Sequence, residues 1–161
     1  MSNLLVQNIK HTNGTTAQTI DSSGRVTTPA IPAFSAGLDT HAPASDYIDN
    51  FHTPHVNVGN HFNASTGTFT APVTGNYFFA AFFMTNNTNA TISYQIRVNG
   101  SDGNQMVPYQ TATGATYHQG SGQCILSLSA GDEVRLYNDN TELYGGSGTG
   151  RHSNFCGYLI G

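Results

Sequence analysis

One stretch of spaced aromatic and glycine residues, from Phe51 to Phe79, restricts the possible folds of this chain more than any other feature. Its last part reads TGTFTAPVTGNYFFAAFFMT, with a short strand around Phe69, turn signals at Pro72 and Gly75, and then a long apolar run. Nearly every residue of that run is apolar, so a strand formed by it must be covered on both faces. The pattern predicts a central strand that is covered on one face by a second sheet. The other face is then covered either by a partner subunit or by another part of the same chain.

The rest of the chain carries strand signals at short spacing, which is typical of an all-β sandwich or barrel. The segment ATISYQIRVNG alternates apolar and polar residues and then turns at Asn99-Gly100. Gly, Asn and Thr interrupt every window in which an amphipathic helix could form. With 161 residues, the chain is long enough for one domain with a sizeable core.

The chain is unusually poor in charge, with 9% charged residues, a formal net charge of −4 and Lys10 as its only lysine. No basic patch is available for nucleic acid, and no run of 18 apolar residues is long enough for a membrane-spanning helix. The segment MSNLLVQNIKHTNG lacks the features of a classical signal peptide, which favours synthesis in a reducing cytosol. We therefore expect a neutral β protein that assembles into something larger, without nucleic-acid binding or membrane insertion.

Two cysteines, Cys124 and Cys156, lie in the apolar segments GQCILSL and NFCGYLI. Free cysteines are among the residues most often buried in protein interiors. We interpret both as buried free thiols, with a disulfide as the alternative.

The spaced positions resemble the signature of the complement C1q globular-head family, which is related to tumour necrosis factor; they are Phe51, Asn57, Phe62, Phe69, Gly75, Tyr77 and Phe79. The segment PAFSAGL resembles the family's first strand, and SNFCGYLI matches its last strand. One departure is Ala81, where the family has an aromatic residue. The resemblance covers residues 32–161 and implies a ten-stranded jelly-roll sandwich that forms homotrimers around a threefold axis.

The resemblance also implies that the NYFFAAFFM strand and the terminal strand share the inner sheet of each subunit. Large aromatic side chains supply much of the binding energy of subunit interfaces. We therefore expect four aromatic residues in or near the trimer interface, and the alternative for each is packing inside one subunit; they are Tyr77, Phe79, Phe155 and Tyr158.

Residues 1–31 form a separate leader, in which Asn13-Gly14 and Ser23-Gly24 are turn signals. The leader resembles the openings of bacteriophage virion fibre and decoration proteins. So small a β segment cannot bury much surface alone, so we expect it to be an anchoring arm that docks on its trimer mates or a larger scaffold. A flexible leader is the alternative. The apolar residues of the arm are Leu4, Leu5, Val6, Ile9, Ile20 and Val26.

No catalytic constellation is present, and we expect neither enzymatic activity nor a cofactor. The histidines His52, His55 and His61 lie close in sequence, but Pro54 prevents a helix that would align them. Some members of the C1q family bind calcium near the trimer apex, yet the spacing of the oxygen ligands here does not resemble a calcium loop. We predict no metal site, and the acidic candidates for one are Asp46, Asp49, Asp102, Asp139 and Glu142.

These observations lead to a virion structural protein of a bacteriophage as the first functional hypothesis. A trimeric capsid decoration or head-fibre protein would attach to the major capsid protein, or another virion component, through residues 1–31 and lie on the virion surface. Its outward loops would offer a weak site for host-surface glycans; they are residues 39–50, 99–105 and 142–151. The alternatives are the receptor-binding tip of a phage tail fibre and a cellular cytokine-like or lectin-like binding module.

Overall fold

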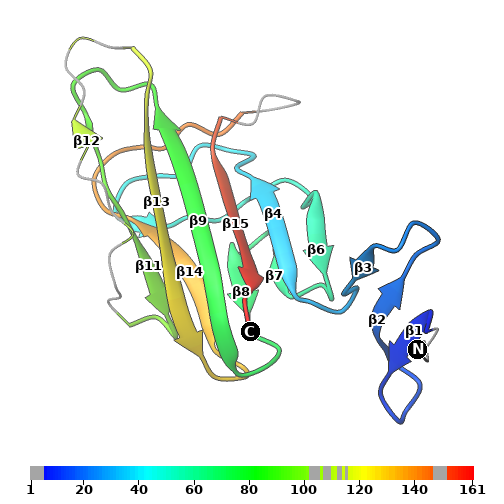
Figure 1. The fold of residues 1–161 in the computed structure, drawn as a ribbon. Coiled ribbons are helices and arrows are strands. Elements are labelled where there is room, and N and C mark those ends of the chain that lie inside the picture. The colour runs from blue at the N-terminus through cyan, green and yellow to red at the C-terminus, as the bar shows by residue number, and fades with distance from the viewer. Residues whose placement is uncertain (1–5, 102–105, 107–109, 112–113, 115, 147–151) are drawn as a thin grey trace.

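The computed structural model describes residues 6–101, 106, 110–111, 114, 116–146 and 152–161. In these ranges every regular element is a β-strand, and none of them contains a helix long and apolar enough to cross a membrane. Figure 1 shows a two-layered head and, beside it, a small separate sheet formed by the N-terminal segment.

One layer of the head is a five-stranded antiparallel sheet, which we call the β9 sheet. Its longest strands, β9 and β13, pair over eleven residues each. The strand order across the sheet is β13 (His118–Leu128), β9 (Gly75–Thr85), β15 (Asn154–Leu159), β4 (Ala33–Gly37) and β6 (Val56–Val58).

The second layer, the β14 sheet, also has five strands among the described residues. Its order is β11 (Tyr94–Val98), β14 (Glu133–Asn138), β8 (Thr68–Thr70) and β7 (Phe62–Asn63), and β5 (Asp46–Tyr47) also pairs with β14. A short pair, β10 (Thr91–Ile92) and β12 (Gln110–Thr111), lies at one end. Ten strands in two facing sheets confirm the predicted all-β, ten-stranded sandwich.

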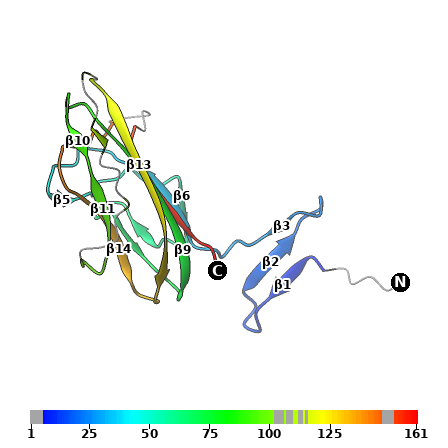
Figure 2. The same ribbon diagram turned by 60° about the vertical axis from the view of Figure 1, so that its left-hand side comes forward.

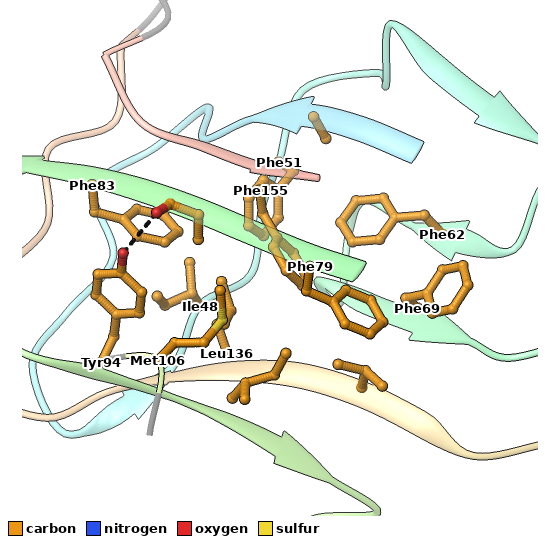
Figure 3. Packing of buried hydrophobic residues seen from close by; sticks show 14 of the residues in the cluster. Ile48, Phe51, Phe62, Phe69, Phe79, Phe83, Tyr94, Met106, Leu136 and Phe155 are labelled. Carbon is orange, nitrogen blue, oxygen red and sulfur yellow. Dashed lines mark hydrogen bonds between the residues drawn. The ribbon is translucent and has the colours of Figure 1, made fainter. Parts of the chain in front are cut away.

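Packed aromatic rings fill the space between the two sheets (Figure 3). Phe34 stacks on Phe62 at a centroid distance of 4.4 Å and on Phe69 at 5.1 Å, and it meets Phe155 edge-on at 4.9 Å. Such pairs contribute about 0.5–1.5 kcal/mol each beyond the burial of apolar area. Since these rings come from β4, β7, β8 and β15, the cluster joins both sheets.

Tyr94 links the two sheets at the other end of the core (Figure 3). Its fully buried hydroxyl donates a hydrogen bond of 2.8 Å to the Ala81 carbonyl on β9, and its ring meets Phe83 edge-on. Burial raises the pKa of Tyr94 far above its ordinary value, so the hydroxyl stays a proton donor. Ala81, where the family has an aromatic residue, is itself buried in this core.

The N-terminal segment forms a small antiparallel sheet of β1 (Asn8–Lys10), β2 (Thr16–Ile20) and β3 (Val26–Thr27). Turns occur at both predicted positions, and Gly14 and Gly24 adopt positive φ in them, whereas Asn13 does not. Hydrogen bonds from the Arg25 backbone N–H and guanidinium hold the pKa of Asp21 below its ordinary value. Figure 2 shows this sheet standing off the head, on the side where the β9 sheet lies. The boundary at residue 31 and the anchoring role stay predictions.

We predict that Gly157→Ala destabilises the fold by about 1–3 kcal/mol, the usual cost of overfilling a packed core. A Cβ atom at Gly157 would lie 2.6 Å from the Phe79 ring and 2.8 Å from the Phe34 ring. Denaturant unfolding measures the effect. Gly161→Ala is the control, because no atom lies within 4 Å of a Cβ there. Equal midpoints for the two variants would contradict this packing.

Candidate functional site

The side of the β9 sheet that faces away from the β14 sheet, which we call the outer face, carries large apolar side chains in solvent. Ile125 is 63% exposed, Tyr158 48% and Phe82 38%. Phe78 on β9 lies directly between Ile125 on β13 and Tyr158 on β15, and the Phe78 and Tyr158 ring centroids are 5.4 Å apart. Three neighbouring strands thus present one continuous apolar row.

The outer face is also free of formal charge. None of the five described strands of the β9 sheet contains Asp, Glu, Lys or Arg. Polar residues on β13, including Ser121, Gln123 and Ser127, border the apolar row. Since no charge loses its hydration when this face is covered, the face is suited to association with another protein surface.

The structure places the four aromatic residues that were predicted in or near the trimer interface. Tyr77, Phe79 and Phe155 have 0% exposure in the single chain, because their side chains point into the core between the sheets. These three side chains therefore pack inside one subunit, which was the alternative for each, and their place in or near the trimer interface stays a prediction. Tyr158 lies on the outer face, and its interface role stays a prediction.

The sequence could not distinguish the two faces of this strand, for a simple physical reason. Successive side chains of a strand point to opposite faces, so a shift of one residue exchanges the two faces. In NYFFAAFFM the side chains on both faces are apolar, and the sequence alone does not reveal which of the two alternating sets faces the core. In the structure Tyr77 and Phe79 face the core. The alternate residues Phe78, Ala80 and Phe82 lie on the outer face.

The two cysteines are free thiols, as predicted, but they are half-buried and lie on different faces of the β9 sheet. Cys124 packs against the core, where burial raises its pKa to about 11. Cys156 lies on the outer face, next to Ala80 of β9. Burial also raises the pKa of Cys156.

The residues considered for a metal do not gather. His52 donates a hydrogen bond of 2.9 Å to the Gly146 carbonyl and contacts Asp39 at 3.2 Å, whereas His61 lies in a groove over the β14 sheet. Asp139 accepts hydrogen bonds from Ser93 and Gln95. Over the described ranges, no group of three or more His, Cys, Asp or Glu side chains is placed to hold a metal ion. Asp102 lies outside the described residues.

Two of the predicted outward loops lie side by side. An isolated bridge joins Ala42 to Leu143, and His41 contacts Glu142 at 3.3 Å. These contacts connect residues 39–50 with the first part of 142–151. Residues 102–105 and 147–151 of the predicted loops lie outside the described residues.

The predicted arm residues divide into exposed and half-buried side chains. Ile9 is 50% and Val26 59% exposed, while Val6 and Ile20 are half-buried. Leu4 and Leu5 lie outside the described residues. An open groove of about 640 Å³ separates the arm from the head and is lined by Ile9, Ala17, Ile31, Pro32, Val73 and Leu159, among others.

The C1q domain family model matches residues 33–160 of this chain. The complement C1q tumor necrosis factor-related protein 3 of Mus musculus is 34% identical over 128 residues, which are 80% of this chain and 50% of that protein. The chain therefore spans about half the length of this curated relative. The family resemblance is confirmed, whereas these relatives do not support the bacteriophage setting.

Solved structures share the fold at low sequence identity. The globular domain of zebrafish complement 1qA protein aligns with a TM-score of 0.60 and 21% identity, over 81% of this chain and 98% of that one. The Eiger TNF structure from S. frugiperda aligns with a TM-score of 0.62 and 14% identity, over 82% and 94%. These similarities confirm the jelly-roll fold.

We predict that Cys124 reacts slowly with a thiol-specific reagent at about pH 8, since a thiol of pKa about 11 is ionised to only about one part in a thousand there. The Cys156→Ser variant isolates Cys124, and the same variant in denaturant is the control. A reaction rate in the native protein equal to the rate in denaturant would contradict the burial.

The raised pKa of Cys124 also makes stability depend on pH. Because its folded pKa lies above the ordinary 9.0, the contribution of Cys124 to stability is complete below that pH and lost as the pH rises through about 11.

Proposed function

Because the chain belongs to the C1q domain family, we propose that it is a non-enzymatic binding module, cytokine-like or lectin-like, that works as a homotrimer. One observation carries the proposal, namely the charge-free apolar row in which Ile125 and Tyr158 are exposed on either side of the half-buried Phe78. Large exposed apolar patches on soluble proteins mark interaction surfaces. A second copy of the same chain is the simplest partner for such a face.

The exposed area of the single chain leaves ample room for such an interface. The chain exposes 8792 Å², whereas a compact monomer of 17.1 kDa is expected to expose about 7,800 Å². The arm that stands off the head accounts for part of the surplus (Figure 2). Subunits that associate stably bury about 800 Å² each, which is about a tenth of the area that this chain exposes.

The predicted trimer can be tested by its mass. Light scattering should give about three times the 17.1 kDa of one chain. Ile125→Lys should reduce the mass to that of one chain, because it places a charge in the centre of the apolar row, where a covered interface cannot hydrate it.

Thr66→Lys is the matched control, since it adds the same charge at an exposed position on the other side of the sandwich. We expect this variant to keep the mass of the parent chain. The proposal fails if the parent chain has the mass of one subunit, or if both variants remain trimeric.

A second candidate function is the virion decoration or head-fibre protein, because the arm stands apart from the head and exposes Ile9 and Val26. In this proposal the arm attaches to the major capsid protein, the head faces outward on the virion surface, and the outward loops contact host-surface glycans. Attachment would bury apolar side chains that one chain cannot cover.

For this candidate, a chain lacking residues 1–29 should still fold but no longer attach to particles, since within the described ranges the arm sheet makes no strand pairing with the head. Quantitative mass spectrometry of purified particles measures the ratio of bound chain to shell protein. The Gly161→Ala chain serves as the full-length control. Undiminished attachment of the truncated chain, or absence of the full chain from particles, would reject this function.

A further inference from the structure

We propose that the outward side of the β14 sheet binds a sugar acid, a hydroxyl-rich ligand that carries one carboxylate. The site is an open polar groove over β7, β8 and β14, with Arg135 at its edge. The inference deepens the proposed binding function by giving its ligand class. It depends on an arginine–tyrosine cluster and on the lining of the groove.

The cluster alternates cationic and aromatic groups across three strands. The Arg135 guanidinium lies 3.9 Å from the centre of the Tyr47 ring, and the Arg97 guanidinium lies 3.6 Å from that of Tyr137. The Tyr47 and Tyr137 rings meet edge-on at 5.4 Å. Both guanidinium groups thus lie over aromatic rings, which offsets part of their lost hydration.

The arrangement places like charges together. Arg97 and Arg135 are direct cross-strand partners of β11 and β14, a position at which like charges destabilise a sheet. The chain has only five Lys and Arg residues in 161, so chance crowding of abundant cations does not account for the pair. Stacking on the tyrosine rings helps the sheet to tolerate this pair, and Arg135 is the member of the pair that also lines the groove.

The groove next to Arg135 offers many hydrogen-bonding groups. Its volume is about 480 Å³, within the range of small-ligand sites. The Arg135 Nε–H donates to the Thr66 carbonyl at 3.1 Å, which holds the side chain at the rim. The lining contains hydroxyl, amide, imidazole and carboxylate groups and no aliphatic side chain; its residues are Asn60, His61, Asn63, Thr66, Thr68, Thr70, Glu133 and Arg135.

This lining selects a sugar acid over a simple anion. The guanidinium of Arg135 pairs well with a carboxylate, because its planar set of donors matches the two oxygens. Glu133 lies on the same side of β14, where its carboxylate accepts hydrogen bonds from hydroxyl groups and repels a bare anion. The amides and threonine hydroxyls suit the remaining ring hydroxyls.

The site is compatible with assembly of the proposed trimer. The groove lies on the β14 sheet, whereas the apolar row lies on the opposite side of the sandwich, on the β9 sheet. Figure 1 shows β14, β8 and β7 in the layer behind the β9 sheet. Three copies joined through the β9 sheets would present three such grooves outward, and weak binding at each would gain from avidity.

The test is calorimetric titration of the full chain with glucuronate, glucose and inorganic phosphate as probes. We expect glucuronate to bind with a Kd on the order of millimolar, at least about tenfold more tightly than either other probe. Arg135→Gln should weaken glucuronate binding by about tenfold or more. Arg25→Gln is the matched control, because it removes the same charge from the exposed arm, where Arg25 pairs with Asp21.

A second variant keeps the test decisive if Arg135→Gln fails to fold. Glu133→Gln keeps the size of an exposed side chain, and it should tighten the binding of glucuronate and phosphate because the repelling charge is gone. The proposal is overturned if glucuronate does not bind, if glucose or phosphate binds as tightly, or if both arginine variants weaken binding equally. Light scattering on the same samples distinguishes the failure of the sugar-acid site from the failure of the trimer. If the protein is a trimer that does not bind glucuronate, only the sugar-acid site is overturned. If the protein is a monomer that binds glucuronate, only the trimer is overturned.

Discussion

The central strand β9 is apolar on both faces, and the arrangement of the rest of the molecule follows from covering them. Its inward residues, including Tyr77 and Phe79, join the aromatic cluster against the β14 sheet. That cluster covers only one face of β9. The other face carries Phe78 and Phe82, for which the described part of the chain supplies no second layer. Burial of apolar area is the main favourable contribution to folding and to association, so the same strand favours a folded head and an assembled one.

The two sheets present surfaces of opposite chemistry. The outward side of the β9 sheet has no formal charge, whereas the outward side of the β14 sheet holds Arg97, Arg135 and Glu133. A face without charge is inexpensive to bury against a protein, while a face with oriented donors and acceptors recognises polar ligands. This separation suits a module in which one sheet assembles subunits and the other remains open to a ligand.

The arm differs from the head in how it is stabilised. Its three short strands have two ordered turns and the Asp21–Arg25 contact, but little covered apolar surface. So small a sheet is marginally stable in water, and packing against a neighbour would stabilise it. The groove between the arm and the head leaves Ile9 and Val73 accessible to such a neighbour.

The sequence alone determined the all-β class, the family and the turns, because these depend on local spacing: alternation, Gly at positive φ, and aromatic residues at fixed intervals. It did not determine which aromatic residues of NYFFAAFFM face inward, since both phases of the strand are apolar and the choice depends on pairing with distant β13 and β15. The arginine–tyrosine cluster could not be predicted from the sequence either. Its members come from β5, β11 and β14, and only the long-range register of these strands brings Tyr47, Arg97 and Arg135 together.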